Sequence, residues 1–357
     1  MRSSRRVAVV GFVAVVVGVT YFTRPVPDRL RSRQVHGGFF DGNVPNIGNV
    51  HLGFWSTEEA VTGSLADDRS GRPQQVVGTR RSDGDYCLAT LRWGETNWVT
   101  NVVLVLKLAN GDRELDGKWI STSGEAPARF HLDRCATVRE VRDSFRMRIG
   151  RYGHNRDFAC PEPSFDGDFQ LYRDTVEQFV RQQHNEFMSD KWSEVWQDIR
   201  WPTFTGWWQY TARCQIRLLT ADLCSVVMDT FPYRGGCGNW ERYATLNCWV
   251  SHGQAGRFEL SQLFRADSEW EPFVRHFCAR DLHRQRAVDY ENDDVGNVEV
   301  ALDLFTVSSC GIQIYFNPYE VGSGAEGAFI VQIPFSELAD LMATNGPGEA
   351  LLLARKR

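Results

Sequence analysis

Alternating hydrophobic and polar positions run through residues 86–135 and predict β-strands there. Val99–Leu108 is an aliphatic and β-branched run. It is followed by Asn110-Gly111, the strongest short signal for a β-hairpin. The pattern is typical of an antiparallel meander, and we assign residues 51–150 to a small β domain.

Residues 157–345 follow a different pattern, in which helical and strand-like segments are mixed. The apolar positions of Phe169–Gln197 recur at helical spacing and predict a long helix. A group of hydrophobic runs bounded by turn residues then predicts three strands. These strands are Gln209–Leu218, Leu223–Phe231 and Arg242–Val250.

A second helix is predicted from the capping-box pair Ser268 and Glu271. It is followed by further strands and a short helix, and residues 346–357 are left as a tail. The predicted later elements are a hairpin of 305–307 with 312–316, a strand at 328–333 and a helix starting over 336–342. Strands run together with helices inserted, so the predicted fold class is α+β. The second domain is expected to hold a mainly antiparallel sheet and two main helices.

An apolar run from Val7 to Phe22 lies near the N-terminus, just behind three arginines. As a helix it covers about 24 Å, whereas a bilayer core measures about 30 Å, so it fits a signal peptide or a short membrane anchor. No small-residue cleavage pattern follows, which favours an uncleaved anchor at residues 7–23. Residues 1–6 are then a short cytoplasmic tail, and the Pro- and Gly-containing residues 24–50 are a stalk that carries the exported domains.

The composition is that of a globular protein, with 42% hydrophobic residues, and the net charge of −5 argues against a nucleic-acid surface. Nine cysteines occur without any C-x-x-C pair, so a zinc site has little support and an oxidising compartment is favoured. Two disulfides are candidates, Cys87–Cys135 near the two ends of the β domain and Cys224–Cys248 across a predicted hairpin. The alternative is that these cysteines pack as small buried hydrophobic residues.

The sequence lacks a recognisable catalytic constellation. It contains no G-x-S-x-G, H-E-x-x-H or S-x-x-K motif, and no second carboxylate can be paired with Glu320. The G-x-G-x-x-G at residues 322–327 lies between two predicted strands, so it predicts a loop and not a dinucleotide site. The acidic cluster at 289–294 lacks calcium-loop spacing and is read as a solvated loop. We therefore expect no enzyme activity, no cofactor and no metal.

Three segments of the second domain carry recognisable motifs: Leu223–Val227 leading to Tyr233-Arg234-Gly235-Gly236, then Gly256–Phe264, and Gly311–Pro334 with Phe316–Val321 inside it. In this order they resemble a domain of unknown function that is shared by RsiV-type anti-sigma factors and some peptidoglycan deacetylases. The resemblance covers roughly residues 157–345. It implies an extracytoplasmic domain, which in RsiV-type proteins binds lysozyme.

Two departures from that family limit what the resemblance implies. Cys237 and Gly238 stand where the family often has alanine and histidine after its Gly-Gly. The tail of six residues before the apolar run is too short to hold a sigma factor, so we expect no anti-sigma activity. The predicted function is a membrane-anchored binding protein that engages lysozyme or cell-wall glycan. The alternative is a cell-wall hydrolase or esterase with a site assembled from dispersed residues.

Candidate binding residues are aromatic or acidic side chains at strand ends and in loops, because exposed indole and phenol rings suit sugars and protein partners. They are Trp207, Trp208, Tyr233, Trp240, Tyr319 and Glu320. The competing interpretation of the tryptophans is that they pack in the core.

Overall fold

The computed structural model of the protein describes residues 31–56, 60–67, 74–93, 98–149, 152–189, 206–233, 241–287 and 301–354. The predicted cytoplasmic tail and membrane anchor, Trp240 and the acidic cluster at 289–294 lie outside these ranges. None of the helices within them is both long and apolar enough to cross a membrane.

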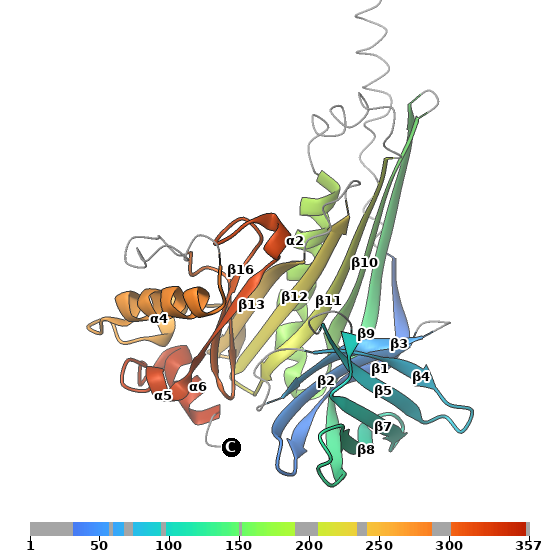
Figure 1. The fold of residues 1–357 in the computed structure, drawn as a ribbon, viewed down its shortest axis with the longest axis horizontal. Coiled ribbons are helices and arrows are strands. Elements are labelled where there is room, and N and C mark those ends of the chain that lie inside the picture. Colours follow the sequence, from blue (N-terminus) through green and yellow to red (C-terminus); the bar gives the residue numbers. More distant parts are fainter. Residues whose placement is uncertain are drawn as a thin grey trace, which may run out of the picture.

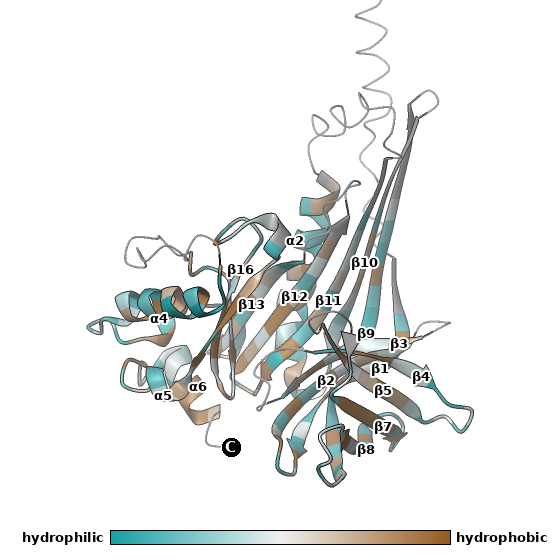
Figure 2. Cartoon of the chain, viewed as in Figure 1, coloured by the Kyte–Doolittle hydropathy of each residue, from teal (hydrophilic) through white to brown (hydrophobic). Residues whose placement is uncertain are grey.

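Eight antiparallel strands close into a barrel at one end of the molecule (Figure 1). Each strand pairs with the next, and β1 pairs with β9 to complete the ring. The strands are β1 (Arg31–Val44), β2 (Gly48–Ser56), β3 (Val61–Asp67), β4 (Gln74–Arg80), β5 (Tyr86–Trp93), β7 (Val102–Ala109), β8 (Glu114–Ser121) and β9 (Ala128–Ile149); the short β6 (Trp98–Val99) pairs with β5. Leu52, Leu65, Leu88 and Leu104 are almost fully buried in the barrel core, and Figure 2 shows the hydrophobic colouring of β5 and β7. Alternation along each strand produces this apolar interior.

The predicted stalk at residues 24–50 is wrong from Arg31 onward, because this segment forms β1 and the start of β2. Its glycines allow close strand contact and do not mark a linker. At Gly37, whose φ is +131°, a Cβ would lie 2.0 Å from the carbonyl oxygen of Phe54. Only glycine fits this conformation and this distance.

The predicted boundary between the two domains, at residues 150–157, is also wrong. β9 is 22 residues long: residues 128–133 pair with β8, residues 133–142 pair with β1, and residues 136–149 pair with β10 (Tyr152–Phe165). The sheet then continues through β11, β12, β13 and β14, so the barrel and the second half share one hydrogen-bonded sheet. The bounds of these strands are β11 (Gly206–Leu219), β12 (Leu223–Tyr233), β13 (Arg242–Ser251) and β14 (Gln254–Arg257). Among the strand pairings of the described residues, only that of β10 with β11 is parallel.

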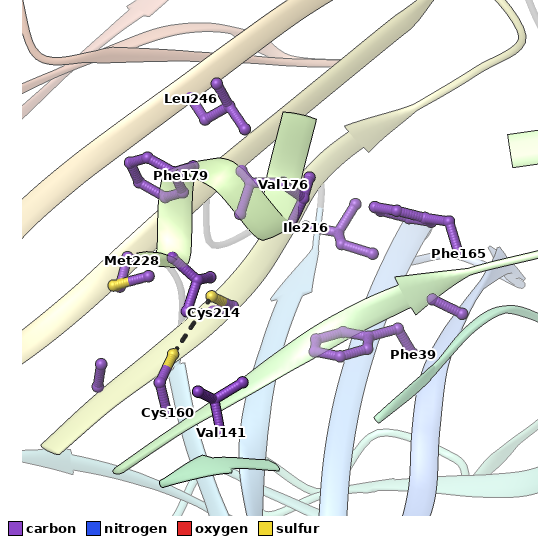
Figure 3. Close-up of a cluster of buried hydrophobic side chains, with 14 of the residues drawn as sticks. Phe39, Val141, Cys160, Phe165, Val176, Phe179, Cys214, Ile216, Met228 and Leu246 are labelled. Carbon is purple, nitrogen blue, oxygen red and sulfur yellow. Dashed lines mark hydrogen bonds between the residues drawn. The ribbon is translucent and has the colours of Figure 1, made fainter. Parts of the chain in front are cut away.

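Helix α2 (Arg173–Ser189), preceded by the 3-10 helix η1 (Gly167–Tyr172), covers one face of this second sheet. Val176, Phe179 and Val180 on α2 are buried against the sheet, as the helical spacing predicts. Five cysteines belong to the same core: Cys135, Cys160, Cys214, Cys224 and Cys248. Figure 3 shows Cys160 and Cys214 facing each other below α2, with their sulfur atoms 3.9 Å apart.

A three-stranded antiparallel sheet packs on the other face of the second sheet. It consists of β15 (Phe305–Ser308), β16 (Gly311–Phe316) and β17 (Phe329–Pro334), and the 3-10 helix η4 (Gly324–Glu326) lies between the last two strands. Buried polar bonds join the two sheets: Ser225 Oγ accepts from the backbone N–H of Val307 at 3.0 Å, and Asn247 donates to the carbonyl of Phe305 at 2.7 Å. The glycine-rich motif at 322–327 is therefore a loop between strands, as predicted.

The remaining helices of the described chain pack beside this small sheet. They are η2 (Leu260–Leu263), α4 (Trp270–Arg284), α5 (Phe335–Leu338) and α6 (Gly346–Ala354). The predicted capping box of α4 is absent, because Ser268 Oγ donates to the carbonyl of Arg265 at 2.7 Å and the helix begins only at Trp270. The predicted tail is also wrong, since residues 346–354 form α6 and Leu351 is fully buried.

The fold as a whole is mostly β, with few helices, so the predicted α+β class overstates the helical part. The mainly antiparallel sheet of the second half and its two longer helices, α2 and α4, are confirmed. The predicted antiparallel meander is confirmed, and the pairing of β1 with β9 closes it into a barrel.

Candidate functional site

Strand β13 leaves part of its backbone without a neighbouring strand. In an antiparallel strand, successive residues direct their N–H and C=O groups to alternate sides. Tyr243 bonds outward to the Asn317 side chain, through its N–H at 2.7 Å and its carbonyl at 3.3 Å. The carbonyl of Asn247 accepts from the Phe258 N–H at 3.1 Å, on the same side. Thr245 lies midway and has the same parity, so its N–H and C=O also point outward.

The pairing of β13 with its neighbours supports this orientation. β12 pairs with residues 242–249 in unbroken register, whereas β14 pairs only with residues 248–251. The outer edge at Thr245 therefore lies beyond the end of β14. No hydrogen-bond partner is recorded for the Thr245 backbone within the described ranges.

A cavity of about 840 Å³ lies along this outer edge. We call it the edge cavity. Its walls come from four separate segments: the middle of β13, the chain around η2, the first turns of α4 and the chain leading into β15. The lining residues are Thr245, Leu246, Asn247, Arg257, Phe258, Glu259, Leu260, Ser261, Trp270, Glu271, Arg275, Ala301, Leu302, Asp303 and Phe305.

Trp270 gives the edge cavity an aromatic wall. Its ring stacks on Phe264 with centroids 4.8 Å apart and an interplanar angle of 2°, which fixes the orientation of the indole. Phe264 is buried, whereas Trp270 is half-buried. One indole face packs on the core, and the residue keeps accessible surface in the cavity wall.

The charged lining residues of the edge cavity carry both signs. Glu271 and Arg275 are one turn apart on α4 and form an ion pair at 2.8 Å. Glu259 caps η2, where its backbone N–H donates to Gln262 Oε1 at 2.8 Å. With Arg257 and Asp303, the lining offers both hydrogen-bond donors and carboxylate acceptors. Such a surface suits a polar, largely neutral ligand better than a highly charged one.

The structure places Tyr319 and Glu320 on the same outer edge of β13. Both belong to the turn that begins at Asn317, whose backbone N–H donates to Glu320 Oε2 at 2.9 Å. Partial burial raises the pKa of Glu320, and the Asp303 carboxylate acts in the same direction, opposed by Arg242. Tyr319 has a φ of 74° and is 60% exposed. The two residues thus lie near the edge cavity without lining it.

The other candidate binding residues lie elsewhere. Trp207 and Trp208 open β11 and pair with Asn155 and Arg156 of β10. Tyr233 ends β12 opposite Gln209, which places it at the same end of the sheet as the two tryptophans. None of these three residues is among those that line the edge cavity.

Neither predicted disulfide is present. Cys87 and Cys135 are free thiols on β5 and β9, and β7 and β8 lie between these strands in the barrel. Cys224 and Cys248 are direct partners on β12 and β13, in the register that the hairpin predicts, and both are free thiols as well. Burial raises the pKa of Cys248 to about 12, which disfavours the reactive thiolate.

The described residues contain no group of three or more His, Cys, Asp or Glu side chains placed to hold a metal ion. Three described residues influence the pKa of Glu320: Asn317, Arg242 and Asp303. A second acid therefore lies near Glu320, and these three neighbours do not include a histidine that could serve as its proton-transfer partner.

Sequence reasoning missed the residues that line the edge cavity, because they come from four segments with no common motif. One signal was present in the sequence: the aromatic and charged residues Trp270, Glu271 and Arg275 fall within six residues of one helix. Helical spacing groups Trp270 with the buried Val274 and Cys278, which accounts only for the indole face that packs on the core.

Comparison with known proteins finds a family model that is similar to part of this site. Residues 261–336 match the model of the family described as protein of unknown function (DUF3298). This range contains the α4 and β15 walls of the edge cavity, whereas β13 and Arg257–Leu260 precede it. No curated protein matches the chain.

Two solved structures of DUF3298 proteins are similar to this chain. One, from Bacteroides fragilis, is 13% identical with a TM-score of 0.40, and the match covers 62% of this chain and 99% of the other. The second, from Pseudomonas aeruginosa PAO1, is 10% identical with a TM-score of 0.40, and the match covers 58% of this chain and 94% of the other.

Proposed function

We propose that this protein is an extracytoplasmic binding protein of the bacterial envelope, held at the membrane by residues 7–23. In this proposal the edge cavity binds cell-wall glycan, and the chain has no anti-sigma activity. The observation that carries it is a cavity of about 840 Å³ with an oriented tryptophan and charges of both signs.

The size and lining of the edge cavity favour a glycan over other small ligands. Ligand cavities usually span roughly 300–1,000 Å³, so this one accommodates a short oligosaccharide. The face of a sugar ring packs well on an indole, and sugar hydroxyls both donate and accept hydrogen bonds. Glu259, Arg275 and Asp303 offer the complementary groups.

Lysozyme is a second candidate ligand, and the exposed Tyr319 beside Glu320 favours it. Tyrosine is enriched in protein interfaces, and a stable interface needs about 800 Å² from each partner. An interface of that area would extend from the edge cavity across the turn that holds Tyr319.

The test is calorimetric titration of the full chain in detergent with soluble peptidoglycan fragments and, separately, with lysozyme. We expect Arg275→Ala to weaken glycan binding by about tenfold or more, because a charge-assisted hydrogen bond contributes about 1.5–3 kcal/mol. Arg280→Ala is the matched control: Arg280 is exposed on the same helix, lies over the Phe277 ring and does not line the cavity.

Two outcomes would contradict the proposal. One is the absence of binding heat above background with both ligands. The other is the appearance of cleaved glycan or released acyl groups in the titrated mixture, measured by mass spectrometry, which would favour a hydrolase or esterase. Binding of lysozyme alone would move the site to Tyr319 and Glu320.

A further inference from the structure

Strand β13 shows within the molecule which chemical group fits its outer edge. At Tyr243 the outward N–H donates to Oδ1 of Asn317 at 2.7 Å, and the outward carbonyl accepts from Nδ2 of the same side chain at 3.3 Å. One primary carboxamide thus bonds both backbone groups of one strand residue. It can do so because its oxygen and one of its two N–H bonds point in the same direction.

Thr245, two residues further along β13, turns the same pair of groups outward. Positions two residues apart on a strand present equivalent edges, so the geometry of Tyr243 recurs at Thr245. Thr245 lines the edge cavity, and no partner of its backbone is recorded within the described part of the chain. A primary carboxamide of a ligand is therefore complementary to Thr245 in the way that Asn317 is complementary to Tyr243.

Other amide and acid groups match Thr245 less well. In a trans secondary amide the N–H and C=O point in opposite directions, so one such group reaches only one of the two backbone groups. A carboxylate carries acceptors only, so it bonds the N–H but is repelled by the carbonyl. The cavity lining already holds three carboxylates against two guanidinium groups, so its charge does not favour a further anion: Glu259, Glu271, Asp303, Arg257 and Arg275.

An extended peptide is the other kind of chain that could bond Thr245. A residue of an added strand also presents its N–H and C=O on one side. In either direction, the peptide residue two places along would lie opposite Tyr243, where the Asn317 side chain is bonded. The occupied position next to Thr245 therefore favours a compact carboxamide over a strand that continues along β13.

We infer that the edge cavity recognises a primary carboxamide on the peptide part of peptidoglycan, which bonds the backbone N–H and C=O of Thr245. The inference rests on the proposed glycan-binding function and names a second feature of the same ligand. The carboxamide comes from the peptide part, where amidation of a carboxyl group creates it. The cavity of about 840 Å³ has room for a short peptide beside a sugar ring that packs on Trp270.

The experiment titrates three muramyl dipeptides calorimetrically into the full chain in detergent. They differ only at one carboxyl group of the dipeptide, which is a primary amide, an N-methylamide or a free carboxylate. We expect the primary amide to bind about tenfold or more tightly than either of the others, because it alone makes both bonds to Thr245. The carboxylate matches the primary amide in size and the N-methylamide matches it in charge, so neither property alone produces this order.

The outcomes separate the inference from the function on which it rests. Equal affinity for the three dipeptides, or tighter binding of the carboxylate or N-methylamide, overturns the inference and leaves the glycan-binding function intact. So does binding of a chitin tetrasaccharide without any binding of the dipeptides. Binding of none of these probes overturns both. Equally tight binding of N-acetylglutamine methylamide, which has a primary carboxamide but no sugar, overturns the assignment to peptidoglycan and indicates a protein side chain.

Two variants at one position test the backbone bonds themselves. Thr245→Pro replaces the outward N–H with a ring carbon, and proline is tolerated where that group faces away from the neighbouring strand. Thr245→Val keeps the N–H and changes only the side chain. We expect Thr245→Pro to weaken binding of the primary amide by about tenfold or more and Thr245→Val to retain the preference for it.

A measurement on the unmodified protein covers the case in which Thr245→Pro fails to fold. The backbone amide resonance of Thr245 is expected to shift when the primary amide dipeptide is added, because its N–H gains a hydrogen bond. An unmoved Thr245 resonance at saturation with this dipeptide overturns the inference.

Discussion

The barrel and the outer edge of β13 use their backbone hydrogen bonds in opposite ways. In the barrel, β1 pairs with β9, so every strand has a neighbour on both sides and the ring has no open edge. At β13 the sheet ends in a strand that β14 covers only over residues 248–251. The closed region has an apolar core, and the open region holds the cavity with polar groups. Closure stabilises a sheet, whereas incomplete pairing leaves groups that can bind a ligand.

The strongest test of this contrast is a pair of glycine substitutions. A Cβ at Gly63 in the barrel would lie 2.0 Å from the Gly53 carbonyl oxygen, while Gly256 in β14 has nothing within 4 Å. We expect Gly63→Ala to lower the free energy of unfolding by about 3 kcal/mol or more, because backbone must move. Gly256→Ala is expected to change it by less than about 0.5 kcal/mol. Denaturant unfolding measures both, and similar values would show that the barrel is no more tightly packed than the edge.

A buried charge lies between the two regions, at Glu162 of β10. Its side chain is 1% exposed and paired with Arg139, yet burial raises its pKa to about 7. The pKa of Glu162 is higher in the folded state than in the unfolded state. Its contribution to the free energy of unfolding is therefore complete at pH values below its unfolded-state pKa. It is lost as the pH rises through about 7.

Glu162→Gln removes this titration. Relative to the unsubstituted protein, we expect its free energy of unfolding to rise by up to about 3 kcal/mol between pH 4.5 and pH 8. Glu177→Gln is the control, because Glu177 bonds the same arginine at 2.9 Å with 28% of its side chain exposed. A stability difference between Glu162→Gln and the parent that stays constant with pH contradicts the expectation.

The smallest expected effect concerns the bond that covers the β13 edge. Asn317→Ala removes both hydrogen bonds to the Tyr243 backbone and should cost about 1–2 kcal/mol, measured by thermal or denaturant unfolding. The barrel offers a matched residue in Asn43, which is exposed and reaches Asn49 only at 3.5 Å. Asn43→Ala should cost less than about 0.5 kcal/mol. Equal costs would mean that Asn317 adds no more than a surface amide.

Local signals in the sequence predicted the local structure well. Asn110 and Gly111 have φ values of 48° and 64°, as a tight hairpin requires, and β12, β13 and the β15–β16 hairpin lie within a few residues of their predicted bounds. In each case neighbouring residues carry the information, and the partner strand follows directly in the chain.

Features that depend on distant pairing were not predictable in the same way. Barrel closure joins β1 to β9 across about a hundred residues, and Gly37 and Gly42 in β1 resemble a linker until their close contacts are known. The edge cavity has the same character, because its four walls meet only after the chain has folded. Trp270 is an example: helical spacing explains why its side chain packs toward the core, where it stacks on Phe264. It does not predict that the same residue lines the edge cavity.

The long strand β9 has a consequence for the modularity of this protein. Residues 128–149 belong to the barrel at one end and to the second sheet at the other. A gene fusion or truncation that divides the protein between residues 128 and 165 damages one of the two fragments. Either the N-terminal fragment has an open barrel, or the C-terminal fragment has a sheet that lacks its pairing with β9. Neither half can therefore be transferred to another protein without the other. Because the two halves share β9, we expect the protein to melt in a single cooperative transition.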